Sequence, residues 1–300
     1  MNSSSPAQQS IGGVCRAVTK ASRSNFTYAF LVLPKVQREA LYAIYAFCRI
    51  SDDLVDETDS AGVAGSTSAA PVGAAERLRA WRVELDACFR GAASHPVTQR
   101  LAEVLRVFPI PRLYFEELLN GMEMDLLKTR YASFADLEQY CYRVAGVVGL
   151  MCIEVFGYTR PETRIYARHL GTAFQLTNVL RDLGRDGAGG RIYVPQDDLA
   201  RFGCSEDDIL SRRLTPAFRA LMKFEVGRAR TFYAAAREAL PAEDRKSMLP
   251  AEIMRVIYNR LLAQIEARSY DVYSRPIRLS DAQRLLLALG CWAKHRLAGG

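Results

Sequence analysis

Residues 40–57 read ALYAIYAFCRISDDLVDE, an apolar stretch that passes directly into a cluster of acids. Pro34 fits the start of a helix, and the pattern predicts that this helix runs to about Glu57. Spacing of i and i+4 places Asp52 and Asp56 on one helix face, one turn apart. Because these acids continue an apolar helix, we expect them to point toward an interior cavity rather than into bulk water.

A second acidic cluster lies far along the chain, on a helix predicted over residues 161–183. It reads NVLRD over residues 178–182, and Asp186 follows four residues later. The helical repeat stacks Asn178, Asp182 and Asp186 over two turns. A lone acidic cluster is usually a solvated helix face. Two clusters that both follow apolar stretches instead indicate that the two clusters share a function.

The two clusters together predict a magnesium site. Carboxylates this close repel each other unless a cation lies among them. Ligand sets made only of oxygen suit hard cations, above all Mg²⁺, which keeps several waters and takes phosphate oxygens as further ligands. Two such helices facing each other would hold a diphosphate through several Mg²⁺ ions.

The remaining sequence favours an all-α protein, because no run alternates with period two for long enough to form a strand. We expect about ten helices in a single-domain bundle around a central cavity. The domain is predicted to span residues 13–300, after a disordered N-terminus at residues 1–12 and with a flexible loop at residues 58–74. Beyond the two acidic helices, helical patterns cover residues 75–89, 96–107, 111–128, 133–157, 215–240, 250–273 and 280–297, with a short helix near 195–199.

Three local signals refine this prediction. Ser133 and Asp136 have the spacing of a capping box with Asp in place of Glu. Residues 145–149, AGVVG, place two glycines inside a helix at a cost of about 1 kcal/mol each relative to Ala, which indicates either close helix packing or room for a ligand. Residues 187–190, GAGG, follow a helix rather than a strand and predict a loop or lid instead of a dinucleotide site.

Composition excludes several classes of protein. The 300 residues are 49% hydrophobic and carry a net charge of +7, with the arginines dispersed, so nucleic-acid binding is not indicated. Seven cysteines without a CxxC pair and three histidines without HExxH argue for a reducing compartment and against zinc. No signal peptide is visible, and the apolar run at residues 285–293 is too short to span a bilayer. We expect a cytoplasmic protein, with peripheral membrane contact for an apolar product left open, and a monomer or a dimer.

Four motifs, in this order and spacing, resemble the squalene/phytoene synthase family of head-to-head prenyl transferases. They are DDLVD at 52–56, YCYRVAGVVG at 140–149, NVLRD at 178–182 and GRIYVP at 190–195. The resemblance covers roughly residues 14–275. Within the family, GMEMDL at 121–126 and YCYR at 140–143 look most like bacterial presqualene diphosphate synthases, with bacterial phytoene synthases close behind.

The resemblance implies an all-α isoprenoid synthase fold and an Mg²⁺-dependent prenyltransferase. Two farnesyl diphosphates would be joined into presqualene diphosphate, with release of diphosphate, in hopanoid or squalene biosynthesis. One alternative is a phytoene synthase that condenses two geranylgeranyl diphosphates in carotenoid biosynthesis. Another is a squalene synthase that also uses NADPH, although no dinucleotide fingerprint supports that cofactor. A reading from another class, a catalytically inactive helical scaffold, is opposed by the intact acidic motifs.

Site residues follow from the same resemblance, position by position. Asp52 and Asp56 match the first metal-binding motif, and Asn178, Asp182 and Asp186 match the second. The diphosphate-binding positions are Asn25, Arg49, Gln175, Asn178 and Arg275, with Gln175 and Ala145 also lining the cavity. The catalytic positions, close to the ionising substrate, are Tyr45, Arg49, Tyr140 and Tyr258.

Two positions depart from the family's pattern. Arg185 stands where the family commonly has an acid, and Asn25 stands where the family favours Ser. The Asn25 amide can still donate a hydrogen bond to a diphosphate oxygen. Arg185 cannot be a metal ligand, but it could pair with diphosphate or with a neighbouring carboxylate.

Overall fold

The computed structural model describes residues 13–19, 26–56 and 73–298. Within these ranges the prediction of an all-α protein is confirmed, since the only β pairing there is one isolated parallel bridge between Arg130 and Ile192. The predicted disordered N-terminus at 1–12, Asn25 and most of the predicted flexible loop lie outside the described residues. The chain packs as two compact units, an N-terminal unit (1–127 with 154–156) and a C-terminal unit (128–153 with 157–300).

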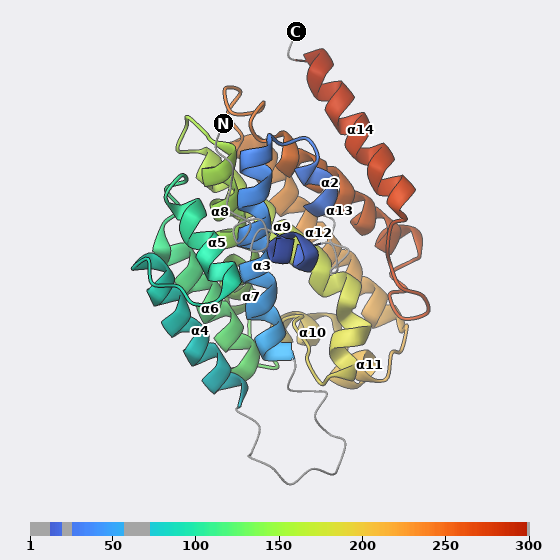
Figure 1. Cartoon of the computed structure of the whole chain (residues 1–300). Helices are drawn as coiled ribbons and strands as arrows, with labels where there is room; N and C mark the ends of the chain where they lie inside the picture. Colours follow the sequence, from blue (N-terminus) through green and yellow to red (C-terminus); the bar gives the residue numbers. More distant parts are fainter. Residues whose placement is uncertain (1–12, 20–25, 57–72, 299–300) are drawn as a thin grey trace. The chain divides into compact units, whose positions relative to one another are not determined.

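The N-terminal unit is built around helix α3, which carries the first acidic cluster (Figure 1). Helices α4, α5 and α6 all pack against α3. The start of α5 is fixed by Pro96 at its first turn and by the His95 ring, whose Nδ1 accepts the Val97 N–H at 3.2 Å. The helices of this unit are residues 13–19, α2 (Phe26–Phe30), α3 (Lys35–Asp56), α4 (Ala74–Phe89), α5 (Pro96–Leu105) and α6 (Arg112–Leu127).

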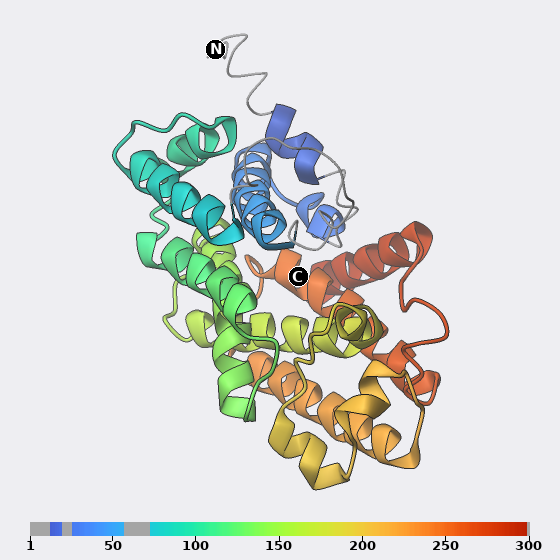
Figure 2. The same ribbon diagram turned by 90° about the horizontal axis from the view of Figure 1, so that it is seen from below.

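The C-terminal unit is organised around helix α9, which carries the second acidic cluster. Helix α12 lies alongside α9 (Figure 2). A π-helical turn, η2, joins α7 to α8, and part of α8 belongs to the N-terminal unit. The elements are α7 (Phe134–Cys141), η2 (Tyr142–Gly146), α8 (Val147–Phe156), α9 (Thr163–Ala188), α10 (Gln196–Phe202), α11 (Glu206–Leu210), α12 (Pro216–Ala239), α13 (Leu249–Ala267) and α14 (Asp281–Ala298).

Helix starts follow the predicted chemistry. The predicted capping box at the start of α7 is confirmed: the Asp136 N–H donates to Ser133 Oγ at 3.3 Å, and the Ser133 N–H donates to Asp136 Oδ2 at 3.1 Å. Ser205 and Asp208 form a second box, at the start of α11. The sequence prediction missed α11 because that helix is only one turn long.

Two helix ends differ from the prediction. Helix α9 continues through Gly184 and Gly187 to Ala188, so the first half of the predicted loop or lid at 187–190 is helical; the chain turns only at Gly190, where φ is +78°. Helix α13 ends at Ala267 instead of near residue 273, because Ser269 and Tyr270 adopt positive φ without any glycine to signal the stop. The extension of α9 keeps Asp186 in helical register with Asp182.

The AGVVG segment is a site of close helix packing. A Cβ on Gly171 of α9 would lie 2.5 Å from the Ala145 carbonyl oxygen, and a Cβ on Gly149 would lie 2.7 Å from the Ala167 carbonyl oxygen. Residues 134–156 are also long and apolar enough, by length and composition, to cross a membrane, but half of that window is buried. The backbone contact with α9 explains this apolar stretch as a core element of the protein.

The close approach at Gly171 predicts a stability effect. Gly171→Ala should lower the free energy of unfolding by about 2 kcal/mol, because the methyl group meets backbone atoms that cannot move without separating the two elements. Chemical denaturation followed by circular dichroism measures this change. The matched control is Gly227→Ala on α12, where a Cβ would meet nothing within 4 Å; it should gain roughly 0.5–1 kcal/mol from helix propensity. Equal effects in the two variants would contradict the packing role.

Candidate functional site

The acidic end of α3 is held by a hydrogen-bonded aromatic contact. The Trp81 indole stacks on Phe47 at 5.3 Å between ring centroids, and its Nε1 donates to Ser51 Oγ at 2.9 Å. Ser51 Oγ in turn donates to the Phe47 carbonyl oxygen at 2.8 Å. Ser51 directly precedes Asp52, so α4 fixes the helical turn that presents the acids.

On α3, the predicted site residues share one face in successive turns. Arg49 Nη1 lies 2.9 Å from Asp52 Oδ2, and Arg49 also pairs with Asp53. The side chains of Arg49 and Asp52 are 41% and 44% exposed, so this pair is open to a ligand. Asp56 is the last residue of α3, where the negative end of the helix dipole adds to the attraction for a cation.

Tyr45 continues the same face one turn before Arg49. Its ring lies 5.7 Å from the ring of Phe26 on α2, at an angle of 52°. The half-buried Tyr45 ring therefore lies next to Arg49 along the helix face.

On α9, the predicted residues likewise follow one face, and one of them has an unsatisfied atom. Asn178 Nδ2 donates to Gln175 Oε1 at 3.2 Å. Asn178 Oδ1 is buried and accepts no hydrogen bond from any residue that the structure describes. A buried oxygen without a donor is costly, and a bound cation would satisfy it.

Asp182 is compensated by two arginines. Arg181 donates to both carboxylate oxygens, with Nε to Oδ1 at 2.9 Å and Nη2 to Oδ2 at 2.6 Å. Arg185 Nη2 lies 3.2 Å from Asp182 Oδ2, and Arg185 Nε lies 3.4 Å from Asp186 Oδ1. Arg185 therefore pairs with neighbouring carboxylates, one of the two roles that the sequence left open. The compensating role of Arg181 was missed, although Arg181 stands inside the NVLRD motif.

The environment of Asp186 is less favourable to a negative charge. Burial, together with the nearby Asp182 carboxylate, raises the pKa of Asp186 to about 6, although Arg185 opposes the shift. Such a carboxylate gains from a counter-cation.

These residues fit a magnesium ion. The described residues contain no group of three or more His, Cys, Asp or Glu side chains that could hold a metal on their own. Mg²⁺ does not need such a group, because it commonly binds one or two carboxylates and fills its other positions with water and phosphate oxygens. The oxygen-only set on α9, with the unsatisfied Asn178 Oδ1, matches that preference.

Tyr140 and Tyr258 are buried in separate aromatic clusters of the C-terminal unit. Tyr140 stacks on Tyr193 at 5.2 Å and lies 5.5 Å from Tyr131. The GRIYVP segment brings Tyr193 there, since the Ile192 N–H donates to the Thr129 carbonyl oxygen at 3.0 Å. Tyr258 lies 4.4 Å from Phe174 on α9.

Arg275 follows α13 in a non-helical segment. Its side chain is exposed and forms no ion pair with a described residue, while its carbonyl oxygen accepts from Arg268 Nη1 at 2.9 Å. The Arg275 guanidinium thus remains available to an anion.

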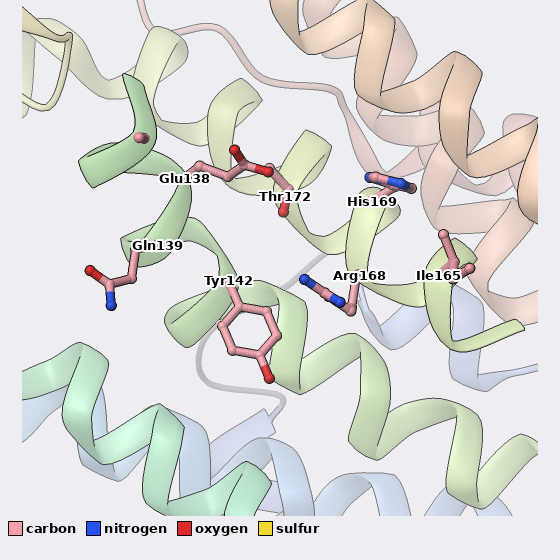
Figure 3. A pocket seen from close by; sticks show the side chains of 8 residues that line it. Glu138, Gln139, Tyr142, Ile165, Arg168, His169 and Thr172 are labelled. Carbon is pink, nitrogen blue, oxygen red and sulfur yellow. The ribbon is translucent and has the colours of Figure 1, made fainter. Parts of the chain in front are cut away.

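A pocket of about 340 Å³ lies between α7–η2 and the first half of α9 (Figure 3). None of the predicted site residues lines it. Its Arg168 guanidinium stacks over the Tyr142 ring at 5.1 Å. The polar lining comprises Glu138, Gln139, Tyr142, Arg168, His169 and Thr172.

A buried charged cluster links α10 to α12 and was not predicted. Arg228 Nη1 lies 2.6 Å from Asp198 Oδ2 and 2.7 Å from Glu225 Oε1, and the guanidinium stacks over Phe134 at 4.1 Å. The i, i+3 spacing of Glu225 and Arg228 is visible in the sequence, but Asp198 joins them only through the tertiary structure.

Known proteins are similar to this chain along most of its length. The family model for squalene/phytoene synthase matches residues 19–285. A phytoene synthase from Arthrospira platensis is 36% identical over 87% of this chain and 86% of its own length. A 15-cis-phytoene synthase from Synechocystis sp. is 35% identical, over 95% and 85% of the two chains.

Solved structures give the same result. A dehydrosqualene synthase in complex with a ligand superposes with a TM-score of 0.85 at 28% identity, covering 97% of this chain and 98% of that one. The squalene synthase HpnC from Alicyclobacillus acidocaldarius superposes with a TM-score of 0.76 at 30% identity, covering 89% and 97%. The expected isoprenoid synthase fold is confirmed.

The charged cluster around Arg228 predicts a pH-dependent stability. Burial, with a contribution from Asp198 and against the opposing effect of Arg228, raises the pKa of Glu225 from 4.5 to about 7. The folded protein therefore binds more protons than the unfolded chain between these values, and the Glu225 contribution to stability falls as the pH rises through this window. In the wild-type chain the free energy of unfolding should therefore fall between about pH 5 and about pH 8. In Glu225→Gln this fall should be smaller by at least ~1 kcal/mol, as measured by urea denaturation.

Glu84 on α4 provides a control of opposite sign. Burial alone would raise the pKa of Glu84, but hydrogen bonds from Thr98, His95 and Ser94 lower it to about 2. Its stabilising contribution is present above the ordinary pKa and is lost as the pH falls, so Glu84→Gln should destabilise the protein at neutral pH. If Glu225→Gln leaves the slope of stability against pH unchanged, the buried carboxylate does not titrate as described.

Proposed function

Because the chain belongs to the squalene/phytoene synthase family, we propose that it catalyses the Mg²⁺-dependent head-to-head condensation of two prenyl diphosphates. The observation that carries the proposal is the repeated arrangement on α3 and α9. Each helix carries a carboxylate of its acidic motif paired with an arginine, Asp52 with Arg49 on α3 and Asp182 with Arg181 on α9. Oxygen ligands combined with arginine suit the recognition of a diphosphate that arrives with Mg²⁺.

On α3, Asp52 and Asp56 would hold Mg²⁺ while Arg49 binds diphosphate oxygens. Arg49 is paired with Asp52 at 2.9 Å, so its guanidinium already stands beside the metal-binding carboxylate. Tyr45, one turn away, would present its ring to the allylic carbon skeleton of the substrate.

On α9, Asn178, Asp182 and Asp186 would hold Mg²⁺, and Gln175 would orient Asn178 through their hydrogen bond at 3.2 Å. Arg181 donates to both carboxylate oxygens of Asp182 and holds that side chain in place, and this makes Arg181 a positioning residue. Arg275, which has no ion pair in the described chain, and Asn25 would bind further diphosphate oxygens.

Bound Mg²⁺ would stabilise the negative charge that develops on the departing diphosphate. Protein side chains would add to this stabilisation, since Arg49 and Arg275 place positive charge at the leaving group. The rings of Tyr45, Tyr140 and Tyr258 would offer π-faces to the carbocation, and apolar surroundings exclude the water that would quench it.

Geranylgeranyl diphosphate is the favoured substrate. The curated relatives at 34–36% identity, from cyanobacteria to plants, carry the name phytoene synthase. The GMEMDL and YCYR motifs instead favour farnesyl diphosphate as the substrate and presqualene diphosphate as the product. The similarity to a dehydrosqualene synthase and a squalene synthase supports presqualene diphosphate as the second candidate product. We therefore propose a phytoene synthase in carotenoid biosynthesis, located in the cytoplasm.

Removing one charge from either acidic motif should stop catalysis. We expect Asp52→Asn and Asp182→Asn each to lower turnover by about a hundredfold or more, because a weakened ligand set must still hold Mg²⁺ and diphosphate together. Steady-state rates at saturating Mg²⁺ test this. Thermal unfolding is measured in parallel, because Asp182→Asn also removes charge beside the half-buried Arg181.

Arg185→Glu is the matched control within the second motif. The Arg185 side chain is 76% exposed and pairs with the Asp182 carboxylate from the solvent side. Its replacement should therefore be tolerated or mildly activating. Near-normal rates in both Asp variants would contradict the assignment of Asp52 and Asp182 as Mg²⁺ ligands. A hundredfold loss in Arg185→Glu would indicate that this chain uses a rebuilt second motif.

The substrate prediction is tested by product analysis. With Mg²⁺ and without NADPH, kcat/KM for geranylgeranyl diphosphate should exceed that for farnesyl diphosphate by about tenfold or more, since a cavity shaped for the longer tail gains extra apolar contact. Chromatography should identify phytoene. Preference for farnesyl diphosphate with accumulation of presqualene diphosphate would restore the second candidate, and conversion to squalene on adding NADPH would indicate a squalene synthase.

A further inference from the structure

Helix α14 exposes its apolar side to solvent. The helix lies against α13 (Figures 1 and 2), with Ala288 buried on the packed side. The opposite side carries most of its large apolar side chains, although a surface helix normally buries them. These are Leu285, Leu286, Leu289, Trp292 and Leu297, with exposed fractions of 44%, 69%, 51%, 38% and 85%.

The concentration of these side chains on one helix is unusual. Five of the fourteen exposed large hydrophobic side chains in the described residues belong to α14. At 100° per residue the five positions fall within one continuous arc of the helix, and Ala282 and Ala293 lie in the same arc. We call this surface the α14 apolar face. A continuous apolar face of this kind marks an interaction site.

Basic side chains lie within and beside the α14 apolar face: at 100° per residue Arg296 falls inside its arc and Lys294 falls outside it. Lys294 and Arg296 form no ion pair among the described residues, and the Arg296 guanidinium stacks over the Trp292 ring at 4.9 Å. The single acid of the helix, Asp281, is already paired with Arg284 at 3.3 Å. The C-terminal turns of α14 therefore combine leucine, tryptophan and uncompensated positive charge.

A basic pocket adjoins the same end of α14. It has a volume of about 570 Å³ and lies between the end of α12, the start of α13 and His295 of α14. Glu252 in its wall is compensated by Arg255 at 2.7 Å and by the Tyr166 hydroxyl at 3.0 Å. Arg237 and Arg245 line the pocket without an ion pair in the described chain, although Glu238 also contributes to the lining.

We propose that the α14 apolar face binds the surface of a membrane that contains anionic lipids. The leucines and Trp292 would enter the boundary between headgroups and acyl chains, while Lys294, Arg296 and the basic pocket would bind lipid phosphates. Interfacial helices combine apolar and aromatic side chains with Lys and Arg in this way. With 18 residues, α14 is about 27 Å long and would lie in the plane of the surface.

Charge favours a membrane over a second copy of the chain as the occupant. Association of two copies through this face would place Lys294 and Arg296 against a second protein whose net charge is also +7. An anionic surface instead supplies the charge that these side chains lack.

Vesicle sedimentation with the purified full chain tests the proposal without any substrate. The protein should bind vesicles of phosphatidylcholine with phosphatidylglycerol about tenfold more tightly than vesicles of phosphatidylcholine alone, and added salt should weaken that binding. The double variant Leu286→Ser/Leu289→Ser should bind about tenfold more weakly. Leu127→Ser, at a leucine of α6 that is more exposed than Leu286 and Leu289, is the matched control and should bind normally.

The electrostatic part has its own pair of variants. Arg245→Glu/Lys294→Glu should remove the preference for anionic vesicles, whereas Lys223→Glu, near the opposite end of α12, should retain it. Absence of vesicle binding by the wild-type chain, or unchanged binding by the leucine variant, would overturn the proposal. So would light scattering that shows a dimer which the leucine variant dissociates. Prenyl transfer assayed in detergent should stay within about twofold in all α14 variants, so failure here is distinct from failure of the proposed function.

Discussion

The contact on which the C-terminal unit depends is the backbone approach between α9 and the π-helical turn η2. At Gly171 there is no space for a Cβ, because the Ala145 carbonyl oxygen would lie only 2.5 Å away. This contact fixes α9, which carries Gln175, Asn178, Asp182 and Asp186, against the segment that carries Tyr140. The cost of glycine within helices, about 1 kcal/mol each, is offset by a packing distance that no other residue allows. The site residues on these two elements therefore depend on a contact that makes no chemical contribution of its own.

Charge compensation is the second constraint, and the two acidic helices meet it in the same manner. On α3 the acids are paired with Arg49, and on α9 they are paired with Arg181 and Arg185. The arrangement on α9 leaves capacity for a cation, because Asn178 Oδ1 accepts no hydrogen bond in the described chain and burial raises the pKa of Asp186 to about 6. Carboxylates that arginines already compensate, and that a cation would stabilise further, suit Mg²⁺ that binds together with a diphosphate substrate. The arginines compensate the carboxylates on both helices, and Arg49 would in addition bind diphosphate.

Burial separates the tyrosines with a proposed catalytic role from the exposed α14 apolar face. Tyr140 and Tyr258 lie inside aromatic clusters, where water is excluded. The leucines of α14 are exposed, on a helix that contributes none of the predicted site residues. A synthase of long hydrocarbons would need a dry interior for its cation and an apolar phase to receive its product. The proposed membrane surface would supply the second requirement.

The sequence by itself determined the helical class, the helix starts with their Pro and Ser signals, and the acidic positions that share a face on each of the two helices. These properties depend on residues three or four positions apart, which one helix brings together without help from the rest of the chain. It did not determine where α9 and α13 end, since Gly184 and Gly187 remain helical through packing and Ser269 adopts a positive φ without a glycine. Nor could it pair Asp198 with Arg228 or Trp81 with Ser51. Those contacts join residues that are distant in sequence, and only the tertiary structure decides which distant residues meet.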